Sequence, residues 1–242
     1  MVRRNRRKAK ANRPIAKQEI WVLSLGGSLI VPHRIDIEFL RRFRIFILRM
    51  VRKGHRFVIV CGGGALCRTY QRAAGDVVAV HPQDLDWIGI HVTRINAHLL
   101  RTIFRDVAHR KVVKDPNEPL DFLEDVLMVA GWKPGFSTDY DAVLLAERFG
   151  SKVVVNLTNV DYLYDRNPLE DKKAKPLSSV TWDDLLKITG TAWKPGLNSP
   201  FDPIASQEAA RSGMTVVLTD GHDFENLEKI LTGKRFHGTV VQ

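Results

Sequence analysis

The chain has 242 residues, of which 44% are hydrophobic, and its 37 Lys and Arg outnumber 27 Asp and Glu to give a formal net charge of +10. This length and composition allow one large domain with a substantial core. No apolar run approaches the roughly 20 residues that cross a bilayer, and the N-terminus lacks the apolar stretch of a secretory signal, so we expect a cytoplasmic protein whose folded part has no membrane partner.

Most of the excess positive charge lies in the first 17 residues. They contain no acidic residue and eight basic ones: Arg3, Arg4, Arg6, Arg7, Lys8, Lys10, Arg13 and Lys17. Such a segment cannot bury enough apolar surface to fold alone, which predicts a disordered tail over residues 1–17. The tail can touch nucleic acid or ribosomes, bind an anionic membrane or remain a solvated extension, and the absence of interleaved aromatic residues favours the last. Nucleic-acid contact is expected only through this tail.

The sequence shows no framework for a structural metal or for covalent catalysis. Cys61 and Cys67 match no metal spacing and fit a reducing compartment, and the eight His residues are scattered. No Walker phosphate loop and no nucleophile elbow is present. We therefore expect no protein-held metal site.

The first half alternates between buried strands and amphipathic helices. A strand over 20–25 stops at Gly26-Gly27, and a helix follows from Asp36 as N-cap to a stop at Gly54. A second strand over 56–61 leads into Gly62-Gly63-Gly64 and a helix over 65–74.

A long helix over 85–109 is expected next, followed by a strand over 126–130. Its inward face is predicted to carry Ile88, Val92, Ile95, Leu99 and Ile103. Three further large apolar residues, Trp87, Ile90 and Leu100, lie off that stripe, which predicts a second contact for this helix.

The second half continues the alternation. Helices are expected over 140–149, 182–189 with Thr181 as N-cap, 203–212 and 224–231, and strands over 152–157, 215–218 and 239–241. Alternating strands and helices predict an α/β fold, a three-layer sandwich in which helices cover both faces of a mainly parallel central sheet.

Four loops of the kind that bind phosphate follow the apolar runs. They are 25–28, 61–64, 131–139 and 158–161, and several precede a helix, so backbone N–H groups would converge where parallel strands end. This layout indicates a nucleotide-dependent phosphotransferase.

The motifs, in their order, resemble the amino-acid kinase superfamily and within it the bacterial and archaeal uridylate kinase branch. The resemblance covers residues 20–242. It is carried by Gly62-Gly63-Gly64 with Arg68, Asp86-Trp87-Ile88-Gly89 leading to Asn96-Ala97, Phe136-Ser137-Thr138-Asp139, Thr158-Asn159-Val160-Asp161 with Tyr164 and Pro168, and Phe201-Asp202-Pro203-Ile204-Ala205.

The resemblance implies a single amino-acid kinase-like domain over 18–242. Its acceptor half would span about 18–150 and its ATP half about 151–242, with the phosphoryl group passing between the Gly-rich loops. Acceptor binding is then expected at Gly63, Asp86, Trp132, Lys133, Pro134, Gly135, Phe136, Ser137 and Thr138. A carboxylate such as Asp86 suits ribose hydroxyls, and Ser137 and Thr138 at a helix start suit an anion.

The resemblance also implies the ATP site and the reacting centre. ATP would contact Gly26, Gly27, Gly64, Arg68, Thr158, Asn159, Asp161, Tyr164 and Asn167, while Asp202, Lys194, Ser24 and Arg68 would act on the transferred group. Asp202 can at the same time cap the following helix. Asp161 fits a turn and an organiser of nearby Lys and amide groups equally well, and Arg68 can pair bidentately with phosphate.

Ser24 departs from the family pattern. Relatives usually have a Lys at this position, whose ammonium neutralises charge on the transferring phosphoryl group, and losing one cation slows such a reaction by about two to three orders of magnitude. Lys133 and Lys194 lie in two copies of Trp-Lys-Pro-Gly, and we take Lys194, next to the Asp202 motif, as the substitute. Lys172, Lys173 and Lys175 can also reach phosphates, and Tyr162 and Asn167 replace the family's usual Gly and Asp.

The expected activity is transfer of phosphate from ATP, with Mg²⁺, to UMP, giving UDP and ADP for pyrimidine nucleotide synthesis. Two alternatives stay open: a kinase of the same fold for another acidic acceptor, such as an acyl glutamate or an isoprenoid phosphate, and a catalytically weak nucleotide-binding protein with a regulatory or storage role. Relatives form dimers that assemble into hexamers, so a homo-oligomer with the long helix at an interface is expected.

Overall fold

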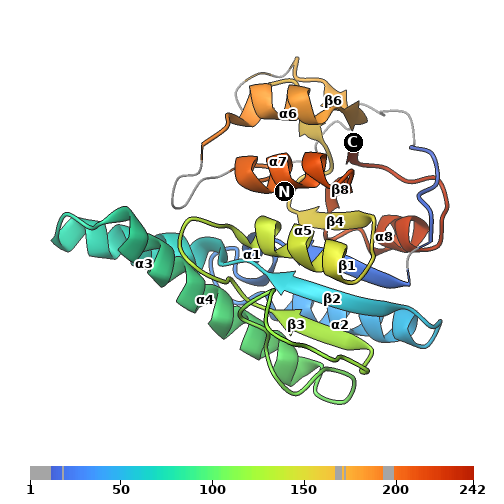
Figure 1. The fold of residues 1–242 in the computed structure, drawn as a ribbon, viewed down its shortest axis with the longest axis horizontal. Helices are drawn as coiled ribbons and strands as arrows, with labels where there is room; N and C mark the ends of the chain where they lie inside the picture. Colours follow the sequence, from blue (N-terminus) through green and yellow to red (C-terminus); the bar gives the residue numbers. More distant parts are fainter. Residues whose placement is uncertain (1–11, 18, 167–170, 172, 193–198) are drawn as a thin grey trace.

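A seven-stranded sheet forms the centre of the computed structural model, which describes residues 12–17, 19–166, 171, 173–192 and 199–242 (Figure 1). Its strand order is β3-β2-β1-β4-β8-β9-β7. All pairings are parallel except that between β8 and β9. The strands are β1 (Ile20–Leu25), β2 (Arg56–Cys61), β3 (Val126–Val129), β4 (Val153–Thr158), β7 (Ser179–Val180), β8 (Thr215–Asp220) and β9 (Thr239–Val241).

Helices cover both faces of this sheet, which makes a three-layer α/β sandwich, as predicted. One face packs against α1 (Gly27–Ile30), α2 (Ile37–Val51), α4 (Pro82–Ile103) and α8 (Phe224–Leu231). The other face packs against α5 (Thr138–Arg148), α6 (Trp182–Thr189) and α7 (Pro203–Arg211). Side chains of β1 alternate between the two layers, since Leu23 belongs to the first core and Val22 to the second.

Local sequence signals account for several boundaries. The Asp36 carboxylate accepts a hydrogen bond from the Phe39 N–H at 2.9 Å, and the Thr181 hydroxyl accepts one from the Asp184 N–H at 3.2 Å, so both residues act as N-caps, as predicted. Gly54, where the helix was expected to stop, has a φ of +84°. Three short elements without a sequence signal are α1, the β5–β6 ribbon (Leu163–Tyr164 with Pro176–Leu177) and β7.

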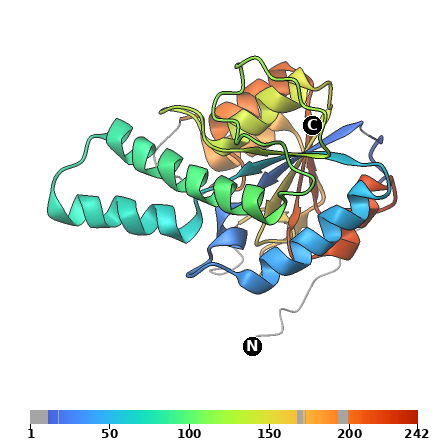
Figure 2. The ribbon, with the colours of Figure 1, turned by 90° about the horizontal axis from the view of Figure 1, so that it is seen from below.

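Helices α3 (Gly64–Val77) and α4 form a hairpin that projects beyond the sheet (Figures 1 and 2). No residue of α3 is buried. In Figure 1 the arrowhead of β2 points toward the side from which this hairpin leaves, so the hairpin rises beside the carboxyl ends of the strands.

The predicted inward face of the long helix was right in part: Val92 is buried, and Leu99 and Ile103 pack against the core. Ile95, expected inside, is 61% exposed, whereas Ile90 and Leu100, expected off the stripe, are buried. The buried face also holds Thr93 and Asn96, which are polar and escaped a search for apolar periodicity. The helix ends at Ile103 rather than at residue 109.

Residues 12–17 lie against the body instead of extending the tail. The Asn12 N–H donates to the Phe236 carbonyl at 2.7 Å, its side-chain amide donates to the Gly238 carbonyl at 2.6 Å, and Ile15 packs against the core. These contacts explain why this segment is not disordered as expected. The many basic residues around Ile15 dominated the composition, so the sequence did not indicate that Asn12 and Ile15 attach to the body. The first 11 residues of the predicted tail lie outside the described part of the chain.

Among the described residues, no helix combines the length and the apolar character that a membrane crossing requires.

Candidate active site

Two glycine-rich loops meet at the carboxyl ends of β1 and β2. A Cβ atom on Gly27 would lie 2.0 Å from the Gly64 nitrogen, and one on Gly64 would lie 2.2 Å from the Gly27 oxygen. Gly64 also has a φ of +70°, which L side chains rarely adopt. Only glycine permits this backbone-to-backbone contact, so the two predicted phosphate loops do come together.

The second loop is held in place from α4. The buried Asn96 amide donates to the Gly62 carbonyl at 2.8 Å and to the Gly63 carbonyl at 3.3 Å. The Gly62 N–H also donates to the Leu25 carbonyl at 2.9 Å, so the loop is fixed both to α4 and to β1. The sequence analysis quoted Asn96 as part of a motif but gave it no role.

Four polar side chains from three elements meet beside these loops. The Ser24 hydroxyl on β1 donates to Oδ1 of Asp139 at 2.8 Å, and Oδ2 of Asp139 accepts from the Asp202 N–H at 3.3 Å. The Ser137 hydroxyl donates to Asp202 through a short hydrogen bond. Ser24, Ser137, Asp139 and Asp202, which we call the seam, thus link β1 and the N-termini of α5 and α7.

Each carboxyl group of the seam also stands at a helix start. Asp202 caps α7 by accepting from the Ile204 N–H at 2.7 Å, so the capping role is present. Ser137 caps α5 by accepting from the Asp139 and Tyr140 N–H groups. Helix N-termini favour negative charge, and their convergence makes this a suitable place for a phosphate group.

Burial raises the pKa of Asp139 to about 7, and the nearby charge of Asp202 adds to that rise, while the hydrogen bond from Ser24 opposes it. Burial also raises the pKa of Asp202, against the hydrogen bonds from Ser137 and from the α7 backbone. Neither carboxyl forms an ion pair with any described residue. Two buried carboxyls without a described cation favour a partly protonated seam.

The predicted acceptor residues lie along one loop and α4. Oδ2 of Asp86 accepts from the Gly135 N–H at 2.8 Å. The rings of Trp132 and Phe136 stack with centroids 5.6 Å apart, and those of Phe136 and Tyr140 with centroids 4.6 Å apart. The Lys133 ammonium sits 3.7 Å above the Trp132 ring centroid, so it is not directed at the seam.

Four of the predicted ATP residues lie at and just after the end of β4: Thr158, Asn159, Asp161 and Tyr164. The hydrogen bonds of their side chains are local. The Thr158 hydroxyl donates to the Val160 carbonyl at 3.1 Å and accepts from the Val160 N–H at 3.1 Å. The Tyr164 hydroxyl donates to Oδ1 of Asp161 at 3.0 Å, so Asp161 closes a turn, and Asn159 is exposed. Gly26 joins this side to β1, because its N–H donates to the Leu157 carbonyl at 2.9 Å.

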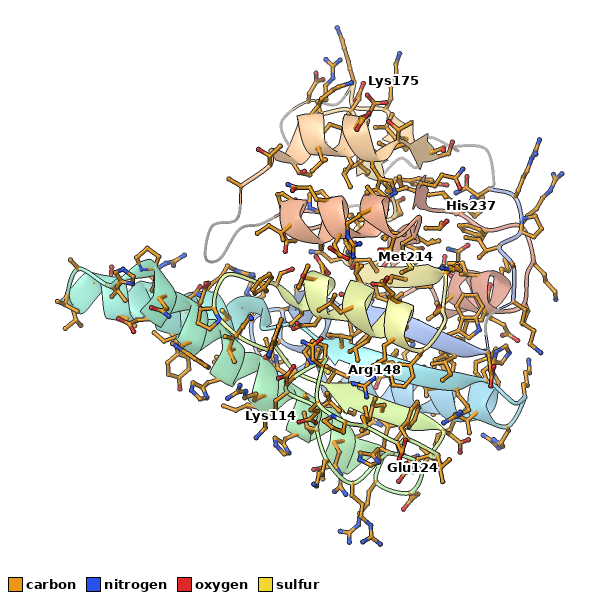
Figure 3. All side chains as sticks on the ribbon, in the orientation of Figure 1. Lys114, Glu124, Arg148, Lys175, Met214 and His237 are labelled. Carbon is orange, nitrogen blue, oxygen red and sulfur yellow. The ribbon has the colours of Figure 1, made fainter. Side chains whose placement is uncertain are left out.

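Several predicted cations lie away from the seam or outside the described residues. Arg68 is exposed on α3, and Figure 3 places Lys175 at the outer edge of the molecule, beyond α6. Lys194, Lys172 and Asn167 lie outside the described part of the chain. The described residues contain no group of three His, Cys, Asp or Glu that could hold a metal ion.

Three residues of this site were missed by the sequence analysis. Asp139 completes the seam, Thr93 accepts from the Gly131 N–H at 2.8 Å, and Asp141 accepts from the Trp132 N–H at 3.2 Å. Asp139 stood inside a recognised motif and was open to prediction. The contacts of Thr93 and Asp141 carried no sequence signal, because their partners are backbone groups far along the chain or on another element.

Comparison with known proteins gives consistent matches over almost the whole chain. Residues 19–220 match the model of the amino acid kinase family. The chain is 33% identical to a uridylate kinase of Pyrococcus abyssi over 224 residues, which cover 91% of this chain and 98% of that protein. It is 35% identical to a uridylate kinase of Methanospirillum hungatei over 223 residues, covering 91% and 93%.

Solved structures agree with these sequence matches. The structure of a uridylate kinase from Archaeoglobus fulgidus superposes with a TM-score of 0.77 at 32% identity, covering 93% of this chain and all of that one. A UMP kinase from Bacillus anthracis, at 20% identity and a TM-score of 0.73, shares the fold.

Proposed function

We propose, from the premise that this chain belongs to the amino acid kinase family, that it transfers a phosphoryl group from ATP to UMP. The observation that carries the proposal is the seam, because it joins β1, α5 and α7 beside the place where the two glycine-rich loops meet. Relatives named uridylate kinase at about a third identity support UMP as the acceptor.

Direct transfer suits the residues present. The acceptor phosphate oxygen forms a bond to the γ-phosphorus of ATP while the bond to the bridging β,γ-oxygen breaks, and ADP leaves with that oxygen. Such transfer depends on alignment and on stabilising negative charge rather than on a protein nucleophile. In this proposal, the glycine-rich loops and the positive ends of the α5 and α7 dipoles supply that stabilisation.

Mg²⁺ would enter the site bound to ATP and would offset the negative charge of its phosphates. Asp202 and Asp139 have the oxygen donors that Mg²⁺ prefers, and two carboxyls suit an ion that keeps several waters and phosphate ligands. In this proposal the acceptor half is about 18–150 and the ATP half about 151–242. The roles of Gly63, Asp86 and loop 131–138 on one side, and of Thr158, Asn159 and Tyr164 on the other, belong to it.

A second candidate follows from Ser24. The Ser24 hydroxyl donates to the Asp139 carboxylate, at the position where relatives usually have the ammonium group of a lysine. The missing positive charge favours a slow or vestigial enzyme that binds nucleotide for regulation or storage. The two candidates differ in turnover, not in nucleotide binding.

One experiment separates them. The full-length protein is incubated with MgATP and a panel of acceptors: UMP, CMP, GMP, AMP, an acyl glutamate and an isoprenoid phosphate. Multiple turnovers with UMP support the first proposal, and multiple turnovers with a different acceptor refute it. Saturable UMP and ATP binding with no product selects the second.

A homo-oligomer and a cytoplasmic setting complete the proposal. Ile90 and Leu100, two of the three residues that predicted a second contact for α4, belong to the core instead. Exposed Ile35, Ile37 and Ile95 remain, and an apolar groove of about 410 Å³ runs between α2 and α4. Light scattering that reports a 27.4 kDa monomer at micromolar concentration refutes the oligomer.

A further inference from the structure

The acceptor loop, residues 131–138, is held by three side chains that capture its backbone N–H groups. Gly131 donates to Oγ1 of Thr93 at 2.8 Å, Trp132 to Oδ2 of Asp141 at 3.2 Å, and Gly135 to Oδ2 of Asp86 at 2.8 Å. These three N–H groups already have partners, so they are not the donors that meet the phosphate of an acceptor.

The side chains that bind the loop come from helices on both sides of it. Asp86 and Thr93 are seven residues apart on α4 and therefore share one face of that helix. Asp141 reaches the loop from the first turn of α5. The Arg94 guanidinium adds a longer contact of 3.4 Å to the Trp132 carbonyl. A loop tied at three points between two helices has little freedom to rearrange.

Thr93 has a defined orientation. Its hydroxyl donates to the Ile90 carbonyl at 2.7 Å, which leaves an oxygen lone pair for the Gly131 N–H. A Cβ atom at position 131 would come within 3.1 Å of this oxygen, so the contact also requires a small residue there. Thr93 is buried, and valine would fill the same space without the hydrogen bonds.

Asp141 acts in this contact as a hydrogen-bond acceptor rather than as a charge. Its carboxyl is buried, and Oδ1 has no hydrogen-bond partner among the described residues. A neutral side chain of the same shape therefore suits the position.

We propose that Thr93 and Asp141 are positioning residues of the acceptor site, which hold loop 131–138 in its binding conformation before the acceptor arrives. This proposal extends the proposed function, and the kinetic part of its test rests on that function. A preformed loop spares the acceptor the cost of ordering it, so losing the hold weakens the acceptor and leaves ATP unaffected.

The test compares Thr93→Val with Thr93→Ser and with Thr102→Val in the full-length protein. Thr102 is a matched control, because it lies on the same helix and its hydroxyl donates to the His98 carbonyl without touching the loop. Thr93→Val should raise the KM for UMP about tenfold and leave the KM for ATP within about twofold, as expected for one lost hydrogen bond. Thr93→Ser should restore most of the affinity, and Thr102→Val should match the parent protein.

Asp141 is tested in the same way. Asp141→Asn, which keeps an acceptor oxygen, should hold the KM for UMP within about threefold, whereas Asp141→Ala should raise it about tenfold. Equal effects of Asn and Ala on this KM would overturn the assignment of Asp141.

Hydrogen exchange provides a readout that needs no activity. Peptides covering 131–138 should exchange about tenfold faster in Thr93→Val, with those covering β1 and β2 unchanged. If the protein makes no UDP, the proposed function fails, and the exchange data alone decide whether the loop is held. Unchanged exchange and unchanged KM in Thr93→Val would overturn the proposal, and faster exchange throughout the chain would show a general structural role instead.

Discussion

The proposed acceptor half and the proposed ATP half differ in the side-chain contacts of their predicted binding residues. In the acceptor half, Asp86 contacts Gly135, which is 49 residues away, and Thr93 contacts Gly131, which is 38 residues away. In the ATP half, the Thr158 hydroxyl contacts Val160 and the Asp161 carboxylate contacts Tyr164, two and three residues away, although the Thr158 carbonyl also accepts from the Gly221 N–H at 2.8 Å. These side-chain hydrogen bonds are therefore tertiary on the acceptor side and local on the ATP side, so removing them should have different costs.

We expect the largest effect in the seam, where ionisation of Asp139 changes the folding stability of the protein. Asp139 keeps its proton in the folded chain up to about pH 7, because burial raises its pKa, while in the unfolded chain it ionises near pH 4. The folded state binds more protons in that window, so stability is full below pH 4 and falls as pH rises toward 7. The difference between the two pKa values corresponds to at most about 4 kcal/mol in the free energy of unfolding.

Asp139→Asn should remove the part of this dependence that comes from Asp139, while the part from the other buried carboxyls, Asp202 and Asp141, remains. Urea unfolding at pH 5 and pH 8 measures it: the parent protein should lose stability between the two, and the variant should lose less. The control Asp121→Asn changes an exposed carboxylate by the same charge. Parallel profiles for Asp139→Asn and the parent would show that this carboxyl is ionised throughout.

The two Trp-Lys-Pro-Gly copies should differ in their effect on catalysis. Lys194→Ala, in the ATP half, should lower turnover more than about a hundredfold, roughly 2.7 kcal/mol, if Lys194 supplies the cation that Ser24 lacks. Lys133→Ala should cost much less turnover, because the Lys133 ammonium rests on the Trp132 ring. Steady-state turnover with ATP affinity measured in parallel separates the two.

Ser24→Lys sharpens the same comparison. It should partly rescue Lys194→Ala, because both lysines would neutralise the same transferring group, whereas Ser24→Met, of similar length and no charge, should not. A silent Lys194→Ala, together with faster turnover in Ser24→Lys alone, would mean that the parent site has no such cation.

Asp86→Asn tests the acceptor half directly. The amide oxygen can still accept from the Gly135 N–H, so the loop should remain held, while the charge-assisted bonds to ribose are lost at about 1.5 to 3 kcal/mol. The KM for UMP should therefore rise more than about tenfold, and the KM for ATP should change little. A KM for UMP equal to that of the parent would remove Asp86 from the acceptor site.

Tyr164→Phe should have the smallest effect. It deletes a half-buried hydroxyl that donates to Asp161, three residues away, and the loss of this hydrogen bond costs about 0.5 to 1.5 kcal/mol. The KM for ATP should rise a few fold with the KM for UMP unchanged. An effect as large as that of Asp86→Asn would show that the ATP half depends on this turn as strongly as the acceptor half depends on its loop.

Local sequence patterns were sufficient for most of the fold. The strands at 20–25, 56–61 and 239–241 and the helices at 182–189 and 224–231 have the expected bounds, because strand runs and capping residues act over a few positions. The exposure of Ile95 was not predicted, because it depends on contacts between distant segments. The face of α4 that turns inward carries Thr93 and Asn96, whose side chains bind two loops, and the spacing of apolar residues does not reveal those contacts.

The sequence by itself determined the family resemblance, the order of the loops and the glycines that allow Gly27 and Gly64 to meet, since these depend on residue type at fixed spacing. Only the tertiary structure decided that Asp139 lies between Ser24 and Asp202, and that Oδ2 of Asp86 accepts from the Gly135 N–H. These partners come from separate elements, and their distance and burial, which govern charge and hydrogen bonding, exist only once the sheet and its two helical layers have packed.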